Sequence, residues 1–355
     1  MKKNDTVRNI IERYHQNSMI PVSPDDFSCH QSIPLSEVNL HLYKSIVPYC
    51  VDFRNRENCY IGNVDIPKSL DAPFLYQYLR ETATSFIKVP WENGPIFPDL
   101  SKLQMPRFIF SPGRCGSTLA GKIVLTAGGV SLSEPDYYSQ ISLAKLSSKD
   151  VAEEERRKFE ALMRKISLDM TIDLLHAYQI NSSQILIKLR SECCLNPKIF
   201  LFSKTRKQDT IFIIRHFKRW AISFASMFAE NNKMEWIENN SVNIYQHAIN
   251  CFAFLKSHSK VHVITYETMT NTDLANASNL SRAFNLRINP EAIKIAASED
   301  SQKGTVLERR THHPSSDELK RIDQAFLRWR KNTQGNFLID NGLGYLLDAD
   351  LHSQP

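Results

Sequence analysis

The sequence predicts an α/β protein, a three-layer sandwich in which helices flank a mostly parallel central sheet. An apolar run over 108–110 is followed by a Pro-Gly turn and then by helix-forming residues. A second apolar run over 211–214 leads into a helix that begins around Phe217. Such strand–helix alternation is typical of parallel sheets with ligands at the carboxyl ends of their strands. We expect five strands, near Phe108, Leu132, Ile185, Ile213 and Val263.

The helices between these strands are predicted from their apolar spacing and end signals. A helix from about Ser117 to Ala127 is stopped by Gly128-Gly129. The stretch from Asp150 to about Tyr178 has apolar residues at three- to four-residue spacing after an acidic opening. A last helix, over 317–330, should direct Leu319, Ile322, Phe326 and Trp329 inward.

The chain is long enough for one large domain with an appendage, since it has 355 residues and 42% hydrophobic content. We place the main domain at residues 101–355. Residues 1–100 are broken into short pieces by prolines, and we expect a cap or substrate-side subdomain there, with a packing scaffold as the alternative. An amphipathic helix is predicted over Asn4–His15 and another helix over Ala72–Leu79.

Composition limits the functional classes. The net charge of +6 is compatible with anionic ligands but is also that of a mildly basic solvated surface, and we expect no nucleic-acid partner. No run of about 18 apolar residues and no signal-peptide core occurs, so we expect a cytoplasmic protein without stable membrane insertion. The seven scattered cysteines lack the paired spacing of metal ligands, and we expect reduced thiols and no metal site.

The loop after the first strand, Ser111–Gly116, is the predicted anion site. Backbone N–H groups at a helix N-terminus favour an anion, and Arg114 adds a fixed positive charge. A Walker A interpretation of Gly116–Lys122 is weaker. Ile123 replaces the hydroxyl residue that would hold magnesium, and Gly121-Lys122 would fall inside the helix.

Three more charged residues follow predicted strands. Glu134 stands at the end of the strand near Leu132, Lys188 near the end of the strand over 184–189, and Arg215 after the strand over 211–214. Arg215 and Ser223, about two turns into the next helix, can converge on one anion. Taken singly, each charged residue is also compatible with a surface or ion-pair role, and Lys188 with a snorkelling edge lysine.

With these motifs in order, residues 105–335 resemble the sulfotransferases that use 3′-phosphoadenosine 5′-phosphosulfate (PAPS), which share a P-loop-like fold. The loop resembles the family's site for the 5′-phosphosulfate, and Arg215 with Ser223 resembles its pair for the 3′-phosphate. The order of Arg114, Glu134, Lys188 and Arg215 is similar to that of the tyrosylprotein branch. Val261–Glu267 resembles a later family strand that ends in Tyr-Glu.

The resemblance implies roles for these residues. Glu134 would be the general base for an acceptor hydroxyl, while Arg114 and Lys188 would hold the sulfonate. Residues implied in cofactor binding are Arg114, Cys115, Gly116, Ser117, Thr118, Arg215, Ser223, Lys303 and Gly304. Cys115 stands where Ser is usual, and Gln302-Lys303-Gly304 matches only part of the family's Arg-Lys-Gly element.

The implied reaction moves the sulfuryl group of PAPS to a hydroxyl-bearing acceptor and leaves adenosine 3′,5′-bisphosphate. A P-loop kinase or NTPase and a non-catalytic nucleotide-binding protein are the alternatives. The sequence does not specify the acceptor, so sugar, phenol, lipid, small metabolite and peptide tyrosine all stay open. It gives no oligomeric state either.

Overall fold

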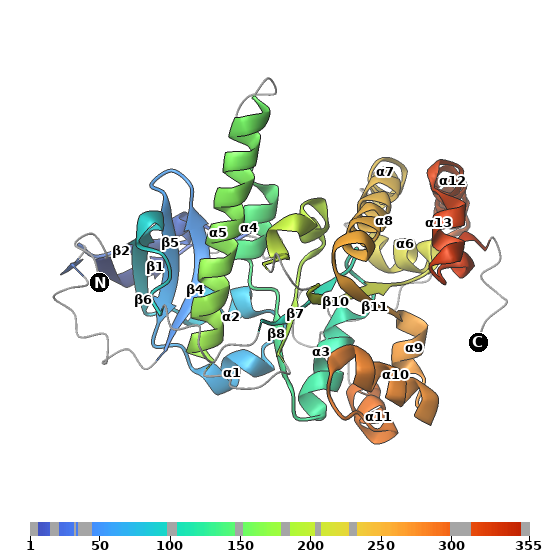
Figure 1. The fold of residues 1–355 in the computed structure, drawn as a ribbon, viewed down its shortest axis with the longest axis horizontal. Helices are drawn as coiled ribbons and strands as arrows, with labels where there is room; N and C mark the ends of the chain where they lie inside the picture. Colours follow the sequence, from blue (N-terminus) through green and yellow to red (C-terminus); the bar gives the residue numbers. More distant parts are fainter. Residues whose placement is uncertain are drawn as a thin grey trace.

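The computed structural model describes residues 6–14, 21–31, 33–34, 45–97, 105–145, 152–178, 185–202, 207–226, 233–298 and 314–348. These residues form a parallel sheet with flanking helices and, beside it, an antiparallel sheet built from the N-terminal part of the chain (Figure 1).

The parallel sheet has five strands in the order β11-β10-β7-β9-β8, and every neighbouring pair is parallel. The strands are β7 (Arg107–Phe110), β8 (Val130–Ser133), β9 (Ile185–Lys188), β10 (Asp209–Ile214) and β11 (Lys260–Thr265). Phe108, Ile109 and Phe110 are fully buried, which explains why the apolar run forms a central strand. The predicted α/β class, with its parallel sheet and all five strand positions, is confirmed.

Helices cover both faces of this sheet. Figure 1 shows α3 and α9 to α11 on one side and α6 to α8 with α12 on the other. The helices of the main domain are α3 (Ser117–Thr126), α4 (Tyr137–Leu143), α5 (Glu153–Ala177), α6 (Phe217–Ala225), α7 (Lys233–Asn239), α8 (Ser241–His258), α9 (Tyr266–Thr270), α10 (Leu274–Phe284), α11 (Pro290–Ser298), α12 (Ser316–Asn332) and α13 (Gly335–Asp340). Short 3₁₀ turns are η5 (Ser191–Leu195), η6 (Pro197–Phe200) and η8 (Gly344–Leu347).

The helix signals predicted for residues 117–127 and 317–330 hold with one exception. Helix α3 ends where Gly128, at φ 81°, turns the chain, and Gly129 N–H bonds the Val124 carbonyl. Helix α12 buries Ile322, Phe326 and Trp329, whereas Leu319 is 40% exposed and does not point inward as predicted.

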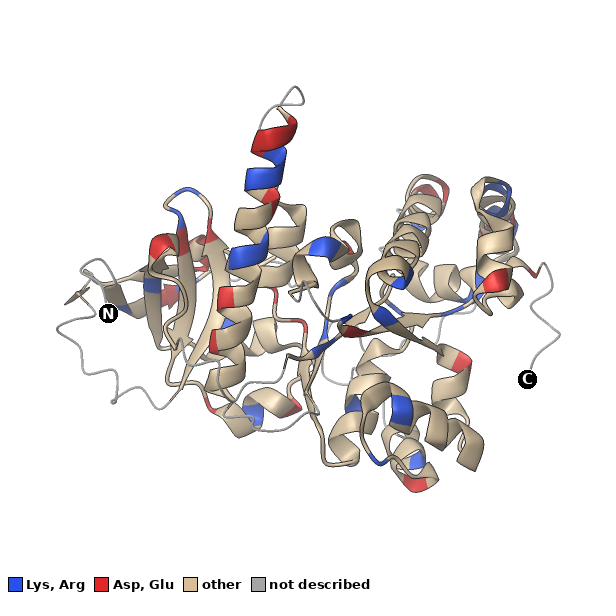
Figure 2. Cartoon of the chain, viewed as in Figure 1, with Lys and Arg blue, Asp and Glu red and all other residues tan. Residues whose placement is uncertain are grey.

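The free end of α5 is a solvated, charged helix. Figure 2 shows acidic and basic residues interspersed along the part that extends away from the antiparallel sheet. Glu153 pairs with Arg157, and Glu154 pairs with Lys158, each at i,i+4 spacing. Such exposed pairs each contribute only about 0.3–0.5 kcal/mol.

Residues 6–97 contribute an antiparallel sheet, which we call the N-terminal sheet unit. Its strands run in the order β2-β1-β6-β5-β4, and β3 pairs with β1. They are β1 (Thr6–Arg13), β2 (Phe27–Cys29), β3 (Ile33–Pro34), β4 (Ile46–Asp52), β5 (Glu57–Gly62) and β6 (Ser85–Pro90). The unit also holds η1 (Pro24–Asp26), α1 (Ile66–Asp71), α2 (Leu75–Thr82) and η4 (Trp91–Asn93).

The helix predicted over Asn4–His15 is therefore wrong for the described part of that segment. β1 pairs with β6 across 70 or more residues, for example Val7 with Ile87, and Val7 is only 3% exposed. The segment is rich in β-branched residues, and pairing with a distant strand decides its conformation. The helix predicted over Ala72–Leu79 is confirmed as α2, shifted toward the C-terminus.

The N-terminal sheet unit shares its core with the main domain. One continuous cluster of buried apolar side chains includes Val22 and Tyr49 on one side and Ile166 and Met170 of α5 on the other. Asp173 of α5 connects the two parts, because its carboxylate accepts hydrogen bonds from Tyr60 Oη (2.8 Å) and from the backbone N–H groups of Ile96 and Phe97. The division of the chain at residue 100 stays a prediction.

Asp173 makes the stability of the fold sensitive to pH. Burial raises the pKa of its carboxyl to about 7 from an ordinary value of 3.8, against the opposing effect of its hydrogen bonds. Folding therefore favours the protonated form, so the stabilisation is fully present below pH 4 and is lost as the pH rises toward 7. We expect the free energy of unfolding of the wild type to fall relative to that of Asp173→Asn by up to about 1.4 kcal/mol per pH unit in this window.

Urea unfolding followed by circular dichroism at pH 5, 6 and 7 measures this difference. Asp25→Asn is the matched control, because the Asp25 side chain is 70% exposed. Parallel pH dependences for the wild type and Asp173→Asn would contradict the expectation.

Candidate functional site

The carboxyl ends of the five parallel strands bring the predicted site residues to one edge of the sheet. Glu134 directly follows β8, and Lys188 is the last residue of β9. The predicted anion loop follows β7, Arg215 follows β10, and Tyr266 follows β11. Because all five strands point the same way, these groups share the edge where α/β folds bind ligands.

The loop between β7 and α3 has an unusual backbone. Gly113 (φ 77°), Arg114 (φ 51°) and Gly116 (φ 85°) all lie in the left-handed region, and only Arg114 of these three carries a β-carbon. Trp220 Nε1 donates to the Gly113 carbonyl at 3.0 Å and holds the loop from outside. Helix α3 has no side-chain cap, so its first N–H groups are available to an anion.

Tyr266 packs between this loop and Arg215. A β-carbon on Gly116 would lie 2.6 Å from Tyr266 Cδ2 and 2.7 Å from Met269 Cε, so the loop rests directly on α9. On the same ring, the Arg215 guanidinium carbon lies 4.3 Å from the centroid. The aromatic ring thus fixes the guanidinium near the loop through a cation–π contact.

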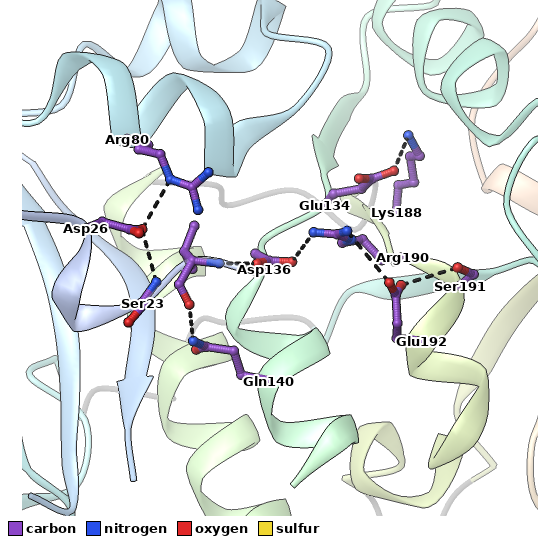
Figure 3. A network of polar contacts seen from close by, with 11 residues as sticks. Ser23, Asp26, Arg80, Glu134, Asp136, Gln140, Lys188, Arg190, Ser191 and Glu192 are labelled. Carbon is purple, nitrogen blue, oxygen red and sulfur yellow. Dashed lines mark hydrogen bonds and ion pairs between the residues drawn. The ribbon is translucent and has the colours of Figure 1, made fainter. Parts of the chain in front are cut away.

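Lys188 joins the loop helix to Glu134. Its Nζ lies 2.8 Å from Glu134 Oε1 and donates to Thr118 Oγ1 at 2.9 Å (Figure 3 shows the pair with Glu134). The Lys188 side chain is 4% exposed and the Glu134 side chain 15% exposed. Glu134 itself has φ 56°, an uncommon conformation for a residue with a side chain, and its N–H bonds the Lys188 carbonyl.

Arg215 and Ser223 lie on the other side of the loop. Arg215 is half-buried, its Nε is buried without a hydrogen-bond partner, and Tyr245 Oη holds its carbonyl at 2.6 Å. Ser223 is half-buried on α6, next to Phe224, whose ring would be 3.3 Å from a β-carbon on Gly113. A buried donor without a partner is costly, so Arg215 Nε is suited to an anionic ligand.

Cys115, Lys303 and Gly304 are three of the predicted cofactor positions. The Cys115 side chain is fully buried, and burial raises the pKa of its thiol, so only its backbone can face a ligand. Lys303 and Gly304 lie outside the described residues. Ser117 and Thr118 occupy the first turn of α3 as predicted.

The Walker A interpretation does not fit the geometry. Gly121 and Lys122 lie within α3, and a β-carbon on Gly121 would meet Ser131 Oγ of β8 at 2.8 Å. Gly121 therefore allows close packing of the helix on the sheet. The cation beside the loop helix comes from Lys188 on a neighbouring strand.

The N-terminal sheet unit contacts this site through Pro73 and Phe74, residues that the sequence did not single out. Lys188 Nζ lies 5.0 Å from the centre of the Phe74 ring, and Ser133 Oγ donates to the Pro73 carbonyl at 2.5 Å. A cavity of about 50 Å³ beside Lys188 is lined by Leu70 to Pro73 and by α3 residues that include Thr118. That volume suits water and is too small for a sugar or a phenol.

Two absences concern the described residues alone. Within them, no group of three or more His, Cys, Asp or Glu side chains is arranged to hold a metal ion. None of the helices in that part of the chain is long and apolar enough to cross a bilayer.

Comparisons with known proteins give structural neighbours only. No protein-family model and no curated protein matches the chain. The sulfotransferase domain from the Synechococcus PCC 7002 olefin synthase is 15% identical, with a TM-score of 0.35 over 64% of this chain and 96% of that one. Retinol dehydratase, solved with androsterone and the inactive cofactor PAP, is 14% identical, with a TM-score of 0.36 over 68% of this chain and 83% of that one.

The contact between Gly116 and Tyr266 predicts a specific cost of substitution. Gly116→Ala places a β-carbon in the left-handed region and against the Tyr266 ring, and we expect it to lower the free energy of unfolding by roughly 2–4 kcal/mol. Gly128→Ala is the control, because Gly128 has a similar φ of 81° but nothing within 4 Å of its β-carbon position. It should cost about 1–2 kcal/mol.

Urea unfolding of both variants measures the difference. Equal destabilisation would show that α9 does not pack on the loop as described.

Proposed function

We propose that this chain is a sulfotransferase that moves the sulfuryl group of PAPS to an acceptor hydroxyl. The observation that carries the proposal is the arrangement at the sheet edge. On one side of β7, this edge carries the uncapped N-terminus of α3 with Lys188 and Glu134. On the other side of β7, it carries Arg215, whose Nε has no hydrogen-bond partner. A donor with two separate anionic groups and a reaction that removes a proton fit this arrangement.

The residues present fit both anionic ends of PAPS. The N–H groups of Ser117 and Thr118, the Arg114 guanidinium and the Lys188 ammonium would hold the 5′-phosphosulfate. Arg215 Nε is buried beside Tyr266 and lacks a partner, and the Ser223 hydroxyl lies on the adjacent helix, so these two would hold the 3′-phosphate. Gly116 and Cys115 contribute backbone, which agrees with the buried thiol.

Glu134 is the proposed general base. When bound, PAPS supplies the sulfuryl group and a bisphosphate that leaves with its electron pair. The Glu134 carboxylate would take the proton of the acceptor hydroxyl as that oxygen bonds to sulfur. Lys188 is close enough to serve both the base and the loop, since it contacts Glu134 and Thr118 at once. Its charge would stabilise the negative charge that develops on the transferred group.

A P-loop kinase is the second candidate, and the residues favour it less. A kinase loop would place the Lys and a hydroxyl residue for magnesium at the end of the loop. Here Lys122 lies within α3 and Ile123 follows it. A nucleotide-binding protein without activity would keep the anion sites but would not need Glu134. The acceptor stays open.

Glu134→Gln tests the chemistry directly. The substitution keeps size and packing but removes the basic carboxylate, so turnover should fall by roughly a hundred- to ten-thousandfold while bisphosphate affinity stays within a few-fold of the wild type. The assay is transfer of ³⁵S from labelled PAPS to a panel of phenols, sugars, sterols and tyrosine peptides. Glu154→Gln, at an exposed position of α5, is the matched control.

Full activity of Glu134→Gln on an acceptor that the wild type sulfonates would place the base elsewhere. Bisphosphate binding without any transfer across the panel would favour the non-catalytic alternative.

A further inference from the structure

A second ion pair lies two residues beyond the first on the same two chain segments. Asp136 follows Glu134 by two residues, and Arg190 follows Lys188 by two. Arg190 Nη1 lies 2.9 Å from Asp136 Oδ1 (Figure 3). The Asp136 side chain is fully buried and the Arg190 side chain is 8% exposed, so each charge depends on the other for compensation.

Asp136 also ties the N-terminal sheet unit to this point. Its second oxygen, Oδ2, accepts the Val22 N–H at 2.6 Å. Gln140 of α4 donates to the Val22 carbonyl and accepts the Val51 N–H at 2.7 Å. Both the N–H and the carbonyl of Val22 are therefore bonded to the chain segment that follows Glu134. These bonds fix the orientation of the Asp136 side chain.

Several charged or titratable groups face Glu134. Lys188 pairs with it from β9 and accepts its N–H through the backbone carbonyl at 2.9 Å, and Arg190 follows Lys188 by two residues. Burial lowers the pKa of the Arg190 guanidinium, but the charges of Asp136, Glu192 and Glu134, in that order, raise it overall. Tyr76 of α2 also faces it; burial first, and then the Glu134 charge, raises the pKa of that phenol. Arg190 packs over the Tyr76 ring at 5.3 Å. Arg190 is therefore a second cation near the base.

We propose that Asp136 is a positioning residue that holds Arg190 away from Glu134. This inference rests on the proposed function, since it concerns the availability of the base. With Asp136 in place, the Arg190 charge is compensated within a buried pair, and Glu134 has Lys188 as its cationic partner. Without Asp136, Arg190 would turn to Glu134 and compete with the acceptor hydroxyl for the carboxylate. Glu192, at 3.6 Å from Arg190 Nη2 and 31% exposed, is too weak a partner to replace Asp136.

Turnover of a pair of variants tests the proposal. Asp136→Asn should lower kcat about tenfold to a hundredfold, by analogy with the loss of groups that orient metal ligands, with bisphosphate affinity unchanged within threefold. Asp136→Asn/Arg190→Gln removes both charges and should recover most of the lost kcat. Rates are expressed per bisphosphate-binding site, so unfolded protein does not lower the measured kcat.

A purely structural role predicts that the double variant is as inactive per site as the single one, and that result would overturn the proposal. If Asp136→Asn does not fold, the double variant alone decides. The double variant should keep kcat within about tenfold of the wild type. A loss of kcat as large as that in Glu134→Gln would contradict the proposal.

A second measurement needs neither PAPS nor an acceptor. In ¹⁵N spectra of the arginine Nε–H groups, Glu134→Gln should leave the Arg190 signal in place in the wild-type background. In the Asp136→Asn background, the same change should move it, because Arg190 has switched to Glu134. If Glu134→Gln leaves the Arg190 signal unchanged in both backgrounds, the proposal is refuted. If the Arg190 signal shifts as expected but the wild type shows no turnover, the proposed function is contradicted and the positioning of Arg190 is not.

Discussion

The arrangement of the site depends on the buried ammonium of Lys188. A lysine that is 3% exposed must have anionic or hydroxyl partners, because an isolated charge is strongly disfavoured away from water. Lys188 finds them in Glu134 and Thr118, which belong to the segments after β8 and β7. One side chain on the strand between them therefore fixes the distance between the candidate base and the helix that would bind the anion. The parallel register of β7, β9 and β8 makes this possible, since it brings all three carboxyl ends to one edge.

The N-terminal sheet unit supports this edge from one side. Phe74 covers Lys188, Tyr76 lies beneath Arg190, and Asp136 binds the backbone of Val22. These contacts exclude water from the ion pairs, and electrostatic interactions are stronger in such an environment. One continuous buried core extends across the two sheets. We expect the unit to act as part of the site, and the cap or substrate-side role of residues 1–100 stays a prediction.

Much of this arrangement could be predicted from the sequence, and the reasons are local. Apolar runs identified the five parallel strands, and the rule that ligands lie at strand carboxyl ends singled out Glu134, Lys188 and Arg215. What could not be predicted depends on distant pairing. β1 looked helical because Val7, Ile10 and Ile11 have helical spacing, and pairing with the distant β6 overrides this local pattern. Phe74 and Tyr76 gave no signal because their contacts with the site lie more than 100 residues away in sequence. Asp136 and Arg190 did give a signal in the sequence, because each repeats the charge of Glu134 or Lys188 two residues later.

We propose that the two cationic regions of this edge bind the two anionic ends of a 3′-phosphorylated adenosine nucleotide without magnesium. Calorimetric titration of adenosine 3′,5′-bisphosphate in EDTA tests this binding most directly, with wild type, Arg215→Ala and Ser223→Ala, and with Arg156→Ala of α5 as the exposed control. The predicted result is binding by the wild type that is weakened about tenfold to a hundredfold in Arg215→Ala and in Ser223→Ala and is unchanged in Arg156→Ala, because a charge-assisted hydrogen bond contributes about 1.5–3 kcal/mol. Binding that is absent in EDTA, or unaffected by Arg215→Ala and Ser223→Ala, would contradict the account.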